Sequence, residues 1–368
     1  MDLFNDQRIV MTLDAGGTNF VFSAIKSGEI IVEPYTLPAE GDNLEKSLEN
    51  IIKGFRYITS QLKEKPAAIS FAFPGPADYP NGVIGDLVNL SAYHGGVALG
   101  PMLEEQFKIP VFINNDGDLF AYGEAIGGIL PEINLKLEKA GSPKRYRNLL
   151  GVTLGTGFGG GVVHDGKLYI GDNAMAAEVY AFRNKLYPKM CAEDGISIRA
   201  VKTSYLKFSG EQENDSITPK DIFLIATGQI KGHKEAAIRA FTEMGEILGD
   251  VLAQLATTLD CLIVIGGGLS GASRFFMPAV LDEMNSWYEL PDGDKVPRLI
   301  QKAVNLDSEE GINVIIHQKT VQLKVFGTDK RINYNPEAIT GVGISRLGTS
   351  KATSLGAVAF ALSMLDSK

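Results

Sequence analysis

Alternating apolar and polar positions near the start of the chain predict two strands joined by a tight turn. Residues 8–14 (RIVMTLD) are rich in β-branched and apolar side chains, and residues 19–25 (NFVFSAI) alternate in the same way. Between them stand Gly16 and Gly17, which suit a sharp reversal of the backbone. Residues 28–38 continue the pattern as a third strand. The chain therefore opens as strand, glycine turn, strand.

Helical spacing follows this strand pattern. Within residues 43–62, apolar side chains recur at three- and four-residue intervals, at Leu44, Leu48, Ile51, Ile52, Phe55, Ile58 and Leu62. Further helices are expected over 118–128, 232–258 and 351–365. Thr218 followed by Pro219 is typical of a helix start, because threonine caps and proline fits the first turn.

Continuous apolar runs predict buried strands elsewhere in the chain. These strands are expected over residues 67–73, 111–116, 148–155 and 261–268, with a hairpin over 161–171 that turns at Asp165–Gly166. The second half of the chain therefore repeats the opening arrangement of strand, glycine turn and strand.

The length of 368 residues favours two domains. We expect a smaller N-terminal α/β domain over 1–122, with a C-terminal helix at about 350–366 packed back on it, and a larger α/β domain over 123–349. Residues 129–148 and 288–312 interrupt the pattern and are expected to be insertions, the first of them at a domain hinge.

Composition narrows the class of protein. Apolar residues make up 45% and charged residues 21%, as in soluble enzymes, and the net charge of −9 argues against a partner that is nucleic acid or an anionic membrane. The two cysteines, Cys191 and Cys261, form no disulfide framework. No apolar run approaches the ~20 residues of a membrane span, and the first residues lack the pattern of a signal peptide. A cytoplasmic location is expected.

Two glycine-rich turns carry the candidate chemistry: residues 14–19 (DAGGTN) and 154–161 (LGTGFGGG). A Walker loop would need a lysine, and a Rossmann turn would open a helix, whereas both turns here lead into strands. Glycine hairpins of this kind let backbone N–H groups approach phosphate oxygens. The residues expected to bind nucleotide are Gly16, Gly17, Thr18, Asn19, Gly155, Thr156 and Gly157, with a third loop at Gly266, Gly267 and Gly268 for the α-phosphate and adenosine. Asp14 is expected to hold Mg²⁺ through water.

The ordered motifs LDAGGTN, FPGP, NND, LGTGFGGG and IVIGGG resemble the landmarks of the ROK family of sugar kinases and sugar-responsive repressors. The resemblance runs from about residue 8 to 366, apart from the two interruptions. It implies the actin-like (ribonuclease H-like) ATPase fold, with two α/β domains around a cleft. It also implies transfer of the ATP γ-phosphate to a hydroxyl of a hexose or hexose derivative.

The same resemblance implies roles for individual residues. Asp116, in the Asn115–Asp116 pair, matches the family's general base, which takes the proton as the sugar oxygen attacks phosphorus. A purely structural alternative is that Asp116 caps the next helix, although Asp118 suits that task better. The expected contacts to the sugar are Gly75, Asn89, Asn115, Asp116, Glu178 and Glu193, with Tyr93 against the pocket wall.

The chain departs from the family between Glu178 and Glu193, where many members hold a structural zinc. Only Cys191 is present there, and Ala181 stands where a histidine is expected, so no zinc site is expected. The loop would then be ordered by packing of Tyr180, Phe182, Leu186 and Tyr187. Loss of the histidine leaves glucose, fructose, mannose and N-acyl amino sugars open as substrates.

Other functions fit the sequence less well. A repressor would need a helix-turn-helix unit before the core, and only 13 residues precede Asp14. A non-catalytic sugar-binding regulator is disfavoured by the presence of both Asp14 and Asp116. A nicotinamide dehydrogenase is disfavoured because the motif GGGLSG does not stand in the sequence context of a dinucleotide-binding fingerprint. A kinase for small carboxylates is disfavoured because it would need arginines in the cleft motifs, which hold Asn, Glu and Asp instead. The expected partner is a small sugar, with a homodimer possible because the family commonly forms one.

Overall fold

The computed structural model describes residues 3–85, 91–212 and 216–367. The chain divides into two compact units, which are described separately below. Unit 1 consists of Met1–Gly128, Gly161–Ala177 and Arg346–Lys368, and unit 2 of Ile129–Gly160 and Glu178–Ser345. The first segment of unit 1 ends at Gly128, whereas the sequence analysis placed the domain boundary after residue 122. That domain boundary remains a prediction.

Unit 1 is built on a mixed sheet with strand order β3-β2-β1-β5-β8, and β4 also pairs with β2. Its strands are β1 (Val10–Ala15), β2 (Asn19–Lys26), β3 (Glu29–Ile30), β4 (Tyr35–Pro38), β5 (Ala68–Ala72) and β8 (Val111–Asn114), with a small hairpin of β6 (Ala77–Asp78) and β7 (Val83–Ile84) beside them. Strands β1 and β2 are antiparallel, whereas β5 lies parallel to both β1 and β8. The carboxyl ends of β1 and β5 therefore meet at one edge of the sheet.

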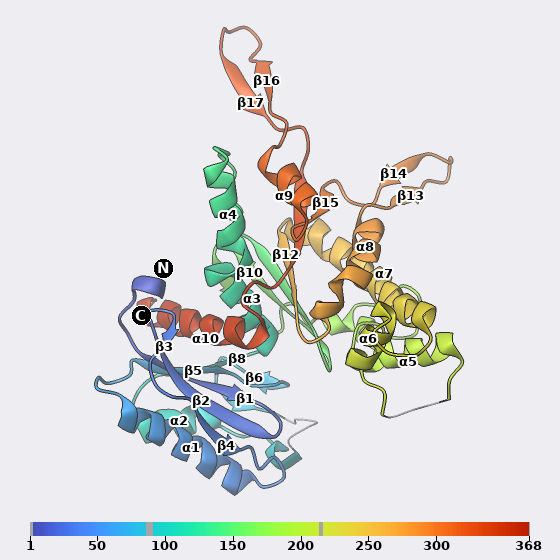
Figure 1. Cartoon of the computed structure of the whole chain (residues 1–368). Helices are drawn as coiled ribbons and strands as arrows, with labels where there is room; N and C mark the ends of the chain where they lie inside the picture. Colours follow the sequence, from blue (N-terminus) through green and yellow to red (C-terminus); the bar gives the residue numbers. More distant parts are fainter. Residues whose placement is uncertain (1–2, 86–90, 213–215, 368) are drawn as a thin grey trace. The chain divides into compact units, whose positions relative to one another are not determined.

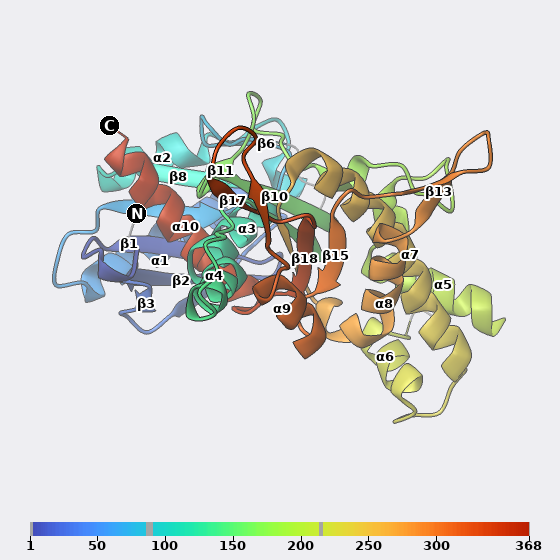
Figure 2. The same ribbon diagram turned by 90° about the horizontal axis from the view of Figure 1, so that it is seen from above.

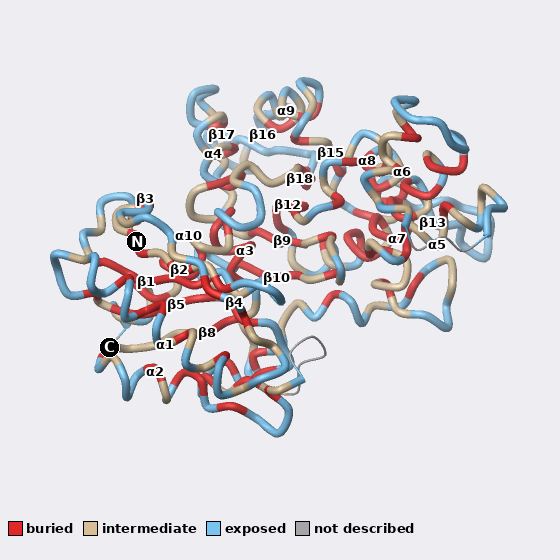
Figure 3. The backbone as a smooth tube through the Cα atoms, turned by 60° about the horizontal axis from the view of Figure 1, so that its bottom comes forward, coloured by how far each residue is buried: buried red, intermediate tan, exposed pale blue. Residues whose placement is uncertain are grey.

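Four helices cover the two faces of this sheet (Figures 1 and 2). They are α1 (Leu44–Gln61) and α2 (Leu99–Phe107) on one face, and α3 (Asp116–Gly127) and α10 (Thr349–Asp366) on the other. Helix α1 begins at its cap Asn43, whose side chain accepts a hydrogen bond from the N–H of Lys46 (3.1 Å). Beneath it, Phe22 and Phe55 meet edge to face, with ring centroids 5.1 Å apart. Figure 3 shows the central strands as the buried part of the unit.

Unit 2 contains the second glycine hairpin. Its sheet has the order β11-β10-β9-β12-β18-β15, and the chain passes into unit 1 within β10, at Gly160–Gly161. The strands of this sheet that lie in unit 2 are β9 (Leu149–Leu154), β12 (Leu262–Gly266), β15 (Lys302–Asn305) and β18 (Ile339–Ile344). Strand β10 (Phe158–His164) begins in unit 2, and β11 (Lys167–Tyr169) belongs to the unit 1 segment. Strand β12 is parallel to both β9 and β18, and is fully buried.

Helices flank the strands of unit 2 as well (Figure 1). They are α4 (Ile129–Lys139), α5 (Ile198–Ser209), α6 (Pro219–Thr227), α7 (Lys234–Leu259), α8 (Ser273–Met284) and α9 (Glu309–Ile316). Two separate hairpins complete the unit: β13 (Trp287–Glu289) with β14 (Lys295–Pro297), and β16 (Val321–Lys324) with β17 (Arg331–Tyr334).

Helices α3 and α10 cross at unusually short range because a glycine stands at each contact. A Cβ added at Gly123 would lie 1.8 Å from the carbonyl oxygen of Ala352, and one at Gly356 would lie 1.9 Å from that of Leu119. Helix α10 is also tied to β5, since the hydroxyl of Ser70 donates to the Ala357 carbonyl (2.7 Å). The glycines therefore fix how α10 lies across α3.

The loop that leads into α10 is held by a buried carboxylate. Glu124 is buried on α3, and its Oε1 accepts hydrogen bonds from the backbone N–H groups of Arg346 and Leu347, each at 3.0 Å. Such charge-assisted bonds are stronger than neutral ones. The start of α10 is thereby fixed to α3 at a second point.

The structure confirms most of the predicted elements and corrects several. The expected strand over 28–38 is two short strands, β3 and β4, because Pro34 lacks the N–H that a continuous strand would donate. The expected strand over 111–116 ends at Asn114, and Asp116 already belongs to α3. The region 288–312 is only partly separate, since β15 pairs with β18 in the main sheet.

Strand β18 and the hairpin β16–β17 were not predicted from the sequence at all. Among the helices in the described residues, none is long and apolar enough to cross a membrane.

We predict that Gly123→Ala destabilises the protein by about 1–3 kcal/mol, because the new methyl group would overlap a backbone oxygen of α10. This cost exceeds the gain of ~1 kcal/mol in helix propensity. Chemical denaturation measures the effect. Gly271→Ala is the matched control, since a Cβ there meets nothing within 4 Å. Equal unfolding free energies for the two variants would contradict the proposed close contact.

Candidate functional site

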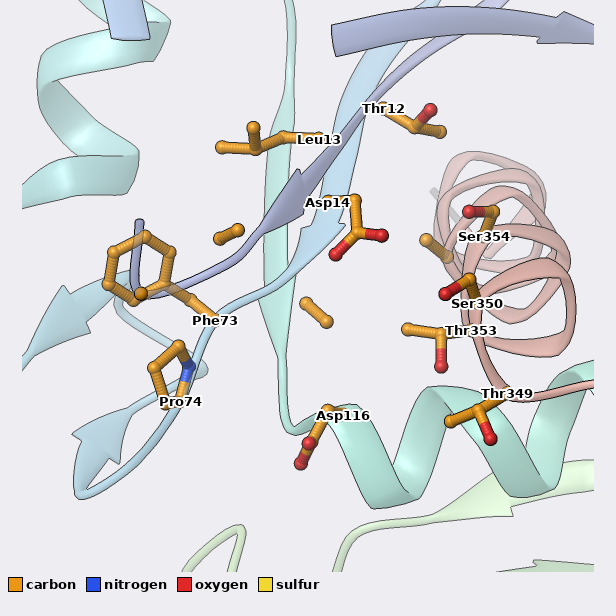
Figure 4. A pocket seen from close by; sticks show the side chains of 14 residues that line it. Thr12, Leu13, Asp14, Phe73, Pro74, Asp116, Thr349, Ser350, Thr353 and Ser354 are labelled. Atoms are coloured by element: carbon orange, nitrogen blue, oxygen red, sulfur yellow. The ribbon is translucent and has the colours of Figure 1, made fainter. Parts of the chain in front are cut away.

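A pocket of about 310 Å³ opens in unit 1 at the carboxyl ends of β1 and β5. Figure 4 shows its walls. The residues that line it are Thr12, Leu13, Asp14, Ala15, Gly17, Ala72, Phe73, Pro74, Asp116, Thr349, Ser350, Thr353, Ser354 and Ala357. Two carboxylates predicted from the sequence, Asp14 and Asp116, therefore line the same pocket.

Asp14 stands near the end of β1, where its backbone pairs with Val21 of β2. Its carboxylate is exposed and projects into the pocket (Figure 4). The glycine turn follows directly: the N–H of Gly16 donates to the carbonyl of Asn19 (3.0 Å), and a Cβ at Gly17 would meet nothing within 4 Å. Thr18 is exposed on this turn, so backbone and hydroxyl groups here are open to a ligand.

Asp116 occupies the first helical position of α3. The helix cap is Asn115, not Asp118 as expected: the Asn115 side chain accepts from the N–H of Gly117 (2.8 Å), while Asp118 is buried further along the helix. The same N–H lies 2.9 Å from an oxygen of Asp116. The Asp116 side chain is exposed to the pocket, and partial desolvation by the protein packed around it raises the pKa of its carboxyl. The hydrogen bonds from Gly117 and from its own N–H oppose that rise.

Tyr79 links the two segments that bring Pro74 and Asp116 to the pocket. Its ring is buried, and its hydroxyl donates to the carbonyl of Phe73 at the end of β5 (3.0 Å). The side-chain amide of Asn115 lies 3.4 Å from the same hydroxyl. Sequence reasoning assigned no role to Tyr79, because a lone tyrosine after a PGP turn carries no signal of this contact. Gly75, expected at the sugar, lies against Tyr79, since a Cβ there would be 3.1 Å from the hydroxyl.

The opposite wall of the pocket carries hydroxyl groups that the sequence analysis missed. Thr349, Ser350, Thr353 and Ser354 lie in the first turns of α10 and line the pocket across from Asp14 (Figure 4). The analysis treated this helix only as a packing element. The signal was present, however, because hydroxyl side chains recur at intervals of three and four in the first turns of a helix that is mostly apolar afterwards.

The second glycine hairpin lies in unit 2 between β9 and β10. Gly155 and Gly157 close its turn through a backbone hydrogen bond of 3.0 Å, and a Cβ at Gly155 would meet only the Gly157 oxygen, at 4.0 Å. Gly157, in contrast, lies against Glu193: a Cβ there would be 2.8 Å from Oε2, which accepts from the N–H of Phe158 (3.0 Å). Glu193, expected at the sugar, thus supports the turn that holds Thr156.

The other glycines of this run serve close packing. A Cβ at Gly159 would lie 2.8 Å from the hydroxyl of Thr153, and one at Gly161 would lie 2.5 Å from the carbonyl oxygen of Gly117. Gly161 belongs to unit 1, so the strand after the turn packs directly on the first turn of α3. The glycines therefore have two functions, open backbone at Gly155 and close strand packing further on.

The third glycine loop borders an apolar pocket of about 270 Å³ in unit 2. Gly266 is the last residue of β12, and Gly267 (φ +88°) lies against the backbone of Leu154, where a Cβ would be 2.3 Å from oxygen. Gly268 has open space and lines the pocket together with Pro219, Lys220, Phe223, Phe241, Leu269, Gly271 and Ala272. Apart from the glycine, the sequence analysis did not identify this pocket, because its residues come from distant helices.

The remaining predicted residues are placed as follows. Glu178 is exposed at the start of a short 3₁₀ turn in unit 2. Tyr93 is fully buried in the core of unit 1, where its hydroxyl lies 3.0 Å from that of Ser47, so it is not a pocket wall. Asn89 lies outside the described residues.

The loop between Glu178 and Cys191 is held by hydrogen bonds, and three of the four side chains expected to pack, Phe182, Leu186 and Tyr187, are half-buried. Asn184 is fully buried, and its Oδ1 accepts from the N–H groups of Leu186 and Tyr187 (3.0 and 3.1 Å). Tyr180 is instead exposed. Among the residues that the structure describes, no group of three or more histidine, cysteine or acidic side chains is placed to bind a metal ion.

Proteins of similar sequence and fold identify the family of this chain. The sequence model of the ROK family matches residues 10–311. The crystal structure of a glucokinase from Parabacteroides distasonis superimposes with a TM-score of 0.90 at 53% identity, over 99% of each chain. A glucokinase from Halalkalibacterium halodurans is 26% identical over 76% of this chain and 86% of its own. An N-acetyl-D-glucosamine kinase from Vibrio cholerae is 27% identical over 70% of this chain and 83% of its own.

The fold is that of the actin-like ATPases, as the motifs predicted. The chain belongs to the ROK family.

We predict that Tyr79→Phe lowers the unfolding free energy by about 1–3 kcal/mol, because the buried carbonyl of Phe73 loses its hydroxyl donor. Urea denaturation measures this loss. Tyr57→Phe is the control: Tyr57 is exposed on α1, and its hydroxyl removal should change stability by less than ~0.5 kcal/mol. A Tyr79→Phe variant as stable as the control would show that this link contributes nothing.

Proposed function

We propose that this chain transfers the γ-phosphate of ATP to a hydroxyl of a hexose or hexose derivative, with Asp116 as general base. It is a phosphotransferase of the hexose-type sugar kinase class. The observation that carries the finer proposal is the position of Asp14 and Asp116 in one pocket of unit 1. Asp14 would hold the Mg²⁺ that binds the phosphates, and Asp116 would accept the proton of the sugar hydroxyl.

The proposed step is a single displacement at phosphorus. The acceptor hydroxyl oxygen forms a bond to the γ-phosphorus while the bond from that phosphorus to the β–γ bridging oxygen breaks, so that ADP leaves. The hydroxyl proton passes to the carboxylate of Asp116. Because Asn115 caps α3 and binds the N–H next to Asp116, the carboxylate is held on a rigid helix end rather than a loop.

The residues present fit a magnesium nucleotide. The exposed carboxylate of Asp14 is an oxygen donor of the kind that Mg²⁺ prefers, and hydroxyls of α10 lie across the same pocket. When bound, the ion would neutralise charge on the β- and γ-phosphates. The open backbone at Gly17 and Gly155 fits phosphate oxygens, since no side chain blocks either turn.

For the nucleoside, we assign the apolar pocket beside Gly268. Phe223 is half-buried and offers aromatic surface for a base, and Lys220 brings a cation to the pocket edge. For the sugar, Asn89, Asn115, Glu178 and Glu193 stay proposed contacts. One carboxylate oxygen of Glu193 accepts a hydrogen bond from the N–H of Phe158, so the contact to a sugar hydroxyl would come from the other oxygen. Asn115 uses its amide oxygen on Gly117, so its contact to a sugar would come through the nitrogen.

Glucose is the first acceptor to test, because the 53% identical relative is named a glucokinase. N-acetylglucosamine follows, because another relative is named a kinase for it. We predict that coupled measurement of ADP release, across hexoses, hexosamines and N-acyl hexosamines, finds turnover that requires both MgATP and one of these sugars. Asp116→Asn should keep sugar affinity and lose ~10²–10⁴-fold or more in kcat.

The Asp116→Asn variant has a clear control for folding. The variant should unfold at about the wild-type temperature, because the amide oxygen of asparagine can still accept the N–H of Gly117. A near-normal rate in this variant would exclude Asp116 as the base. Saturable sugar binding without ADP release in the wild type would instead indicate a non-catalytic regulator.

The carboxyl group of Asp116 should also set the pH dependence of kcat/KM. The base must be ionised to accept a proton, and its pKa is raised above the ordinary aspartate value. We therefore predict that kcat/KM falls as pH decreases, and that the fall begins at a higher pH than an unperturbed aspartate would give. Steady-state kinetics at subsaturating sugar measure this profile. An acid limb that survives unchanged in Asp116→Asn would assign it to another group.

A further inference from the structure

The hairpin β16–β17 in unit 2 has one apolar face that nothing in the described chain covers. Its register pairs Val321 with Tyr334 and Leu323 with Ile332, which places these four side chains together on one face. The alternate pairs, Gln322 with Asn333 and Lys324 with Arg331, form the other face. All four apolar side chains are exposed. We call residues 319–334 the basic arm.

An amphipathic hairpin of this kind implies a partner surface. Two-stranded hairpins are at best marginally stable alone in water, and three or more strands or a packed face are needed. Phe326 at the tip of the arm is fully exposed. Neighbouring apolar side chains left in water on one face are typical of an interaction surface rather than of scattered surface residues.

The net charge of the basic arm indicates the charge that its partner surface should carry. The charged residues of 319–334 are Lys319, Lys324, Asp329, Lys330 and Arg331, four positive and one negative, which gives +3 on a chain of net charge −9. The only pair among them that the structure records, Lys324 with Asp329, is long (3.9 Å) and exposed, so it contributes little. The basic arm therefore fits an acidic surface that also offers apolar side chains.

Unit 2 itself carries acidic and apolar side chains on its other hairpin, where Tyr288 and Val296 share one face and Trp287 and Glu289 share the other. Residues 287–297, which we call the acidic arm, contain Glu289, Asp292 and Asp294 against Lys295, which gives −2. Trp287 is 62% exposed there. The remaining exposed apolar side chains of this arm are Tyr288, Leu290 and Val296.

The two arms extend separately from unit 2 (Figures 1 and 2), and the exposure of their apolar side chains shows that they do not cover each other within one chain. We propose that they meet between two copies of this chain: the basic arm of each copy docks on the acidic arm of the other. In a dimer with two-fold symmetry this contact occurs twice, so the buried area is twice that of a single pair of arms. The inference does not depend on the proposed kinase activity.

Sedimentation velocity at several protein concentrations tests the proposal. We expect the wild type to dimerise. The basic-arm variant Lys324→Glu/Arg331→Glu should weaken the dimer at least ~tenfold through like-charge repulsion, and so should the acidic-arm variant Glu289→Lys/Asp292→Lys/Asp294→Lys. Lys46→Glu/Lys53→Glu is the control for the first variant, because it makes the same change of net charge on the exposed face of α1 and should leave the dimer intact. Thermal unfolding confirms that each variant is folded.

The decisive result comes from combining the variants. An equimolar mixture of the basic-arm variant and the acidic-arm variant should form a heterodimer, because each arm then meets one of opposite charge. A wild type that stays monomeric at every concentration would overturn the proposal. So would a dimer that both arm variants leave unchanged, or a mixture of the two that fails to associate, since each would place the contact elsewhere or nowhere.

Discussion

The short contact between α3 and α10 is the constraint on which unit 1 depends. Gly123 and Gly356 let the two backbones approach to a distance that no larger residue would permit. Helix α3 begins with Asp116, and α10 begins with the hydroxyl-bearing residues of the pocket wall. The crossing therefore sets where the carboxylate and the hydroxyls lie, and residues that contact no substrate determine the shape of the pocket.

The glycine-rich turns illustrate how one residue type meets two physical demands. At Gly17 and Gly268 nothing lies within 4 Å of an added Cβ, and at Gly155 only one oxygen does, so the backbone stays available to a ligand. At Gly161 and Gly267 a neighbouring backbone fills that space. Composition alone cannot separate the two cases, since both look the same in sequence. Only the packed structure shows which glycines leave their backbone open and which permit close approach.

The sequence was sufficient to predict the central strands, the long helices and the position of Asp14, because periodicity and glycine turns report local backbone directly. It was insufficient for Tyr79, for the hydroxyls of α10 and for Phe223, which reach their pockets only through tertiary packing. The capping residue of α3 was also mistaken: Asn115 and Asp118 have similar propensities, and the end of β8 decides between them. The roles of the individual site residues stay proposals.

Unit 1 is assembled from three separated stretches of chain, and the last of them begins at Arg346. Its pocket wall on α10 is therefore synthesised after the whole of unit 2. Domains generally fold as units, and the N-terminal one usually folds first during translation. Here unit 1 cannot be completed first, because the part of its sheet that α10 covers stays open until the last segment, Arg346–Lys368, has been made. Nascent chains stalled before residue 349 would carry an apolar sheet surface that a chaperone has to shield.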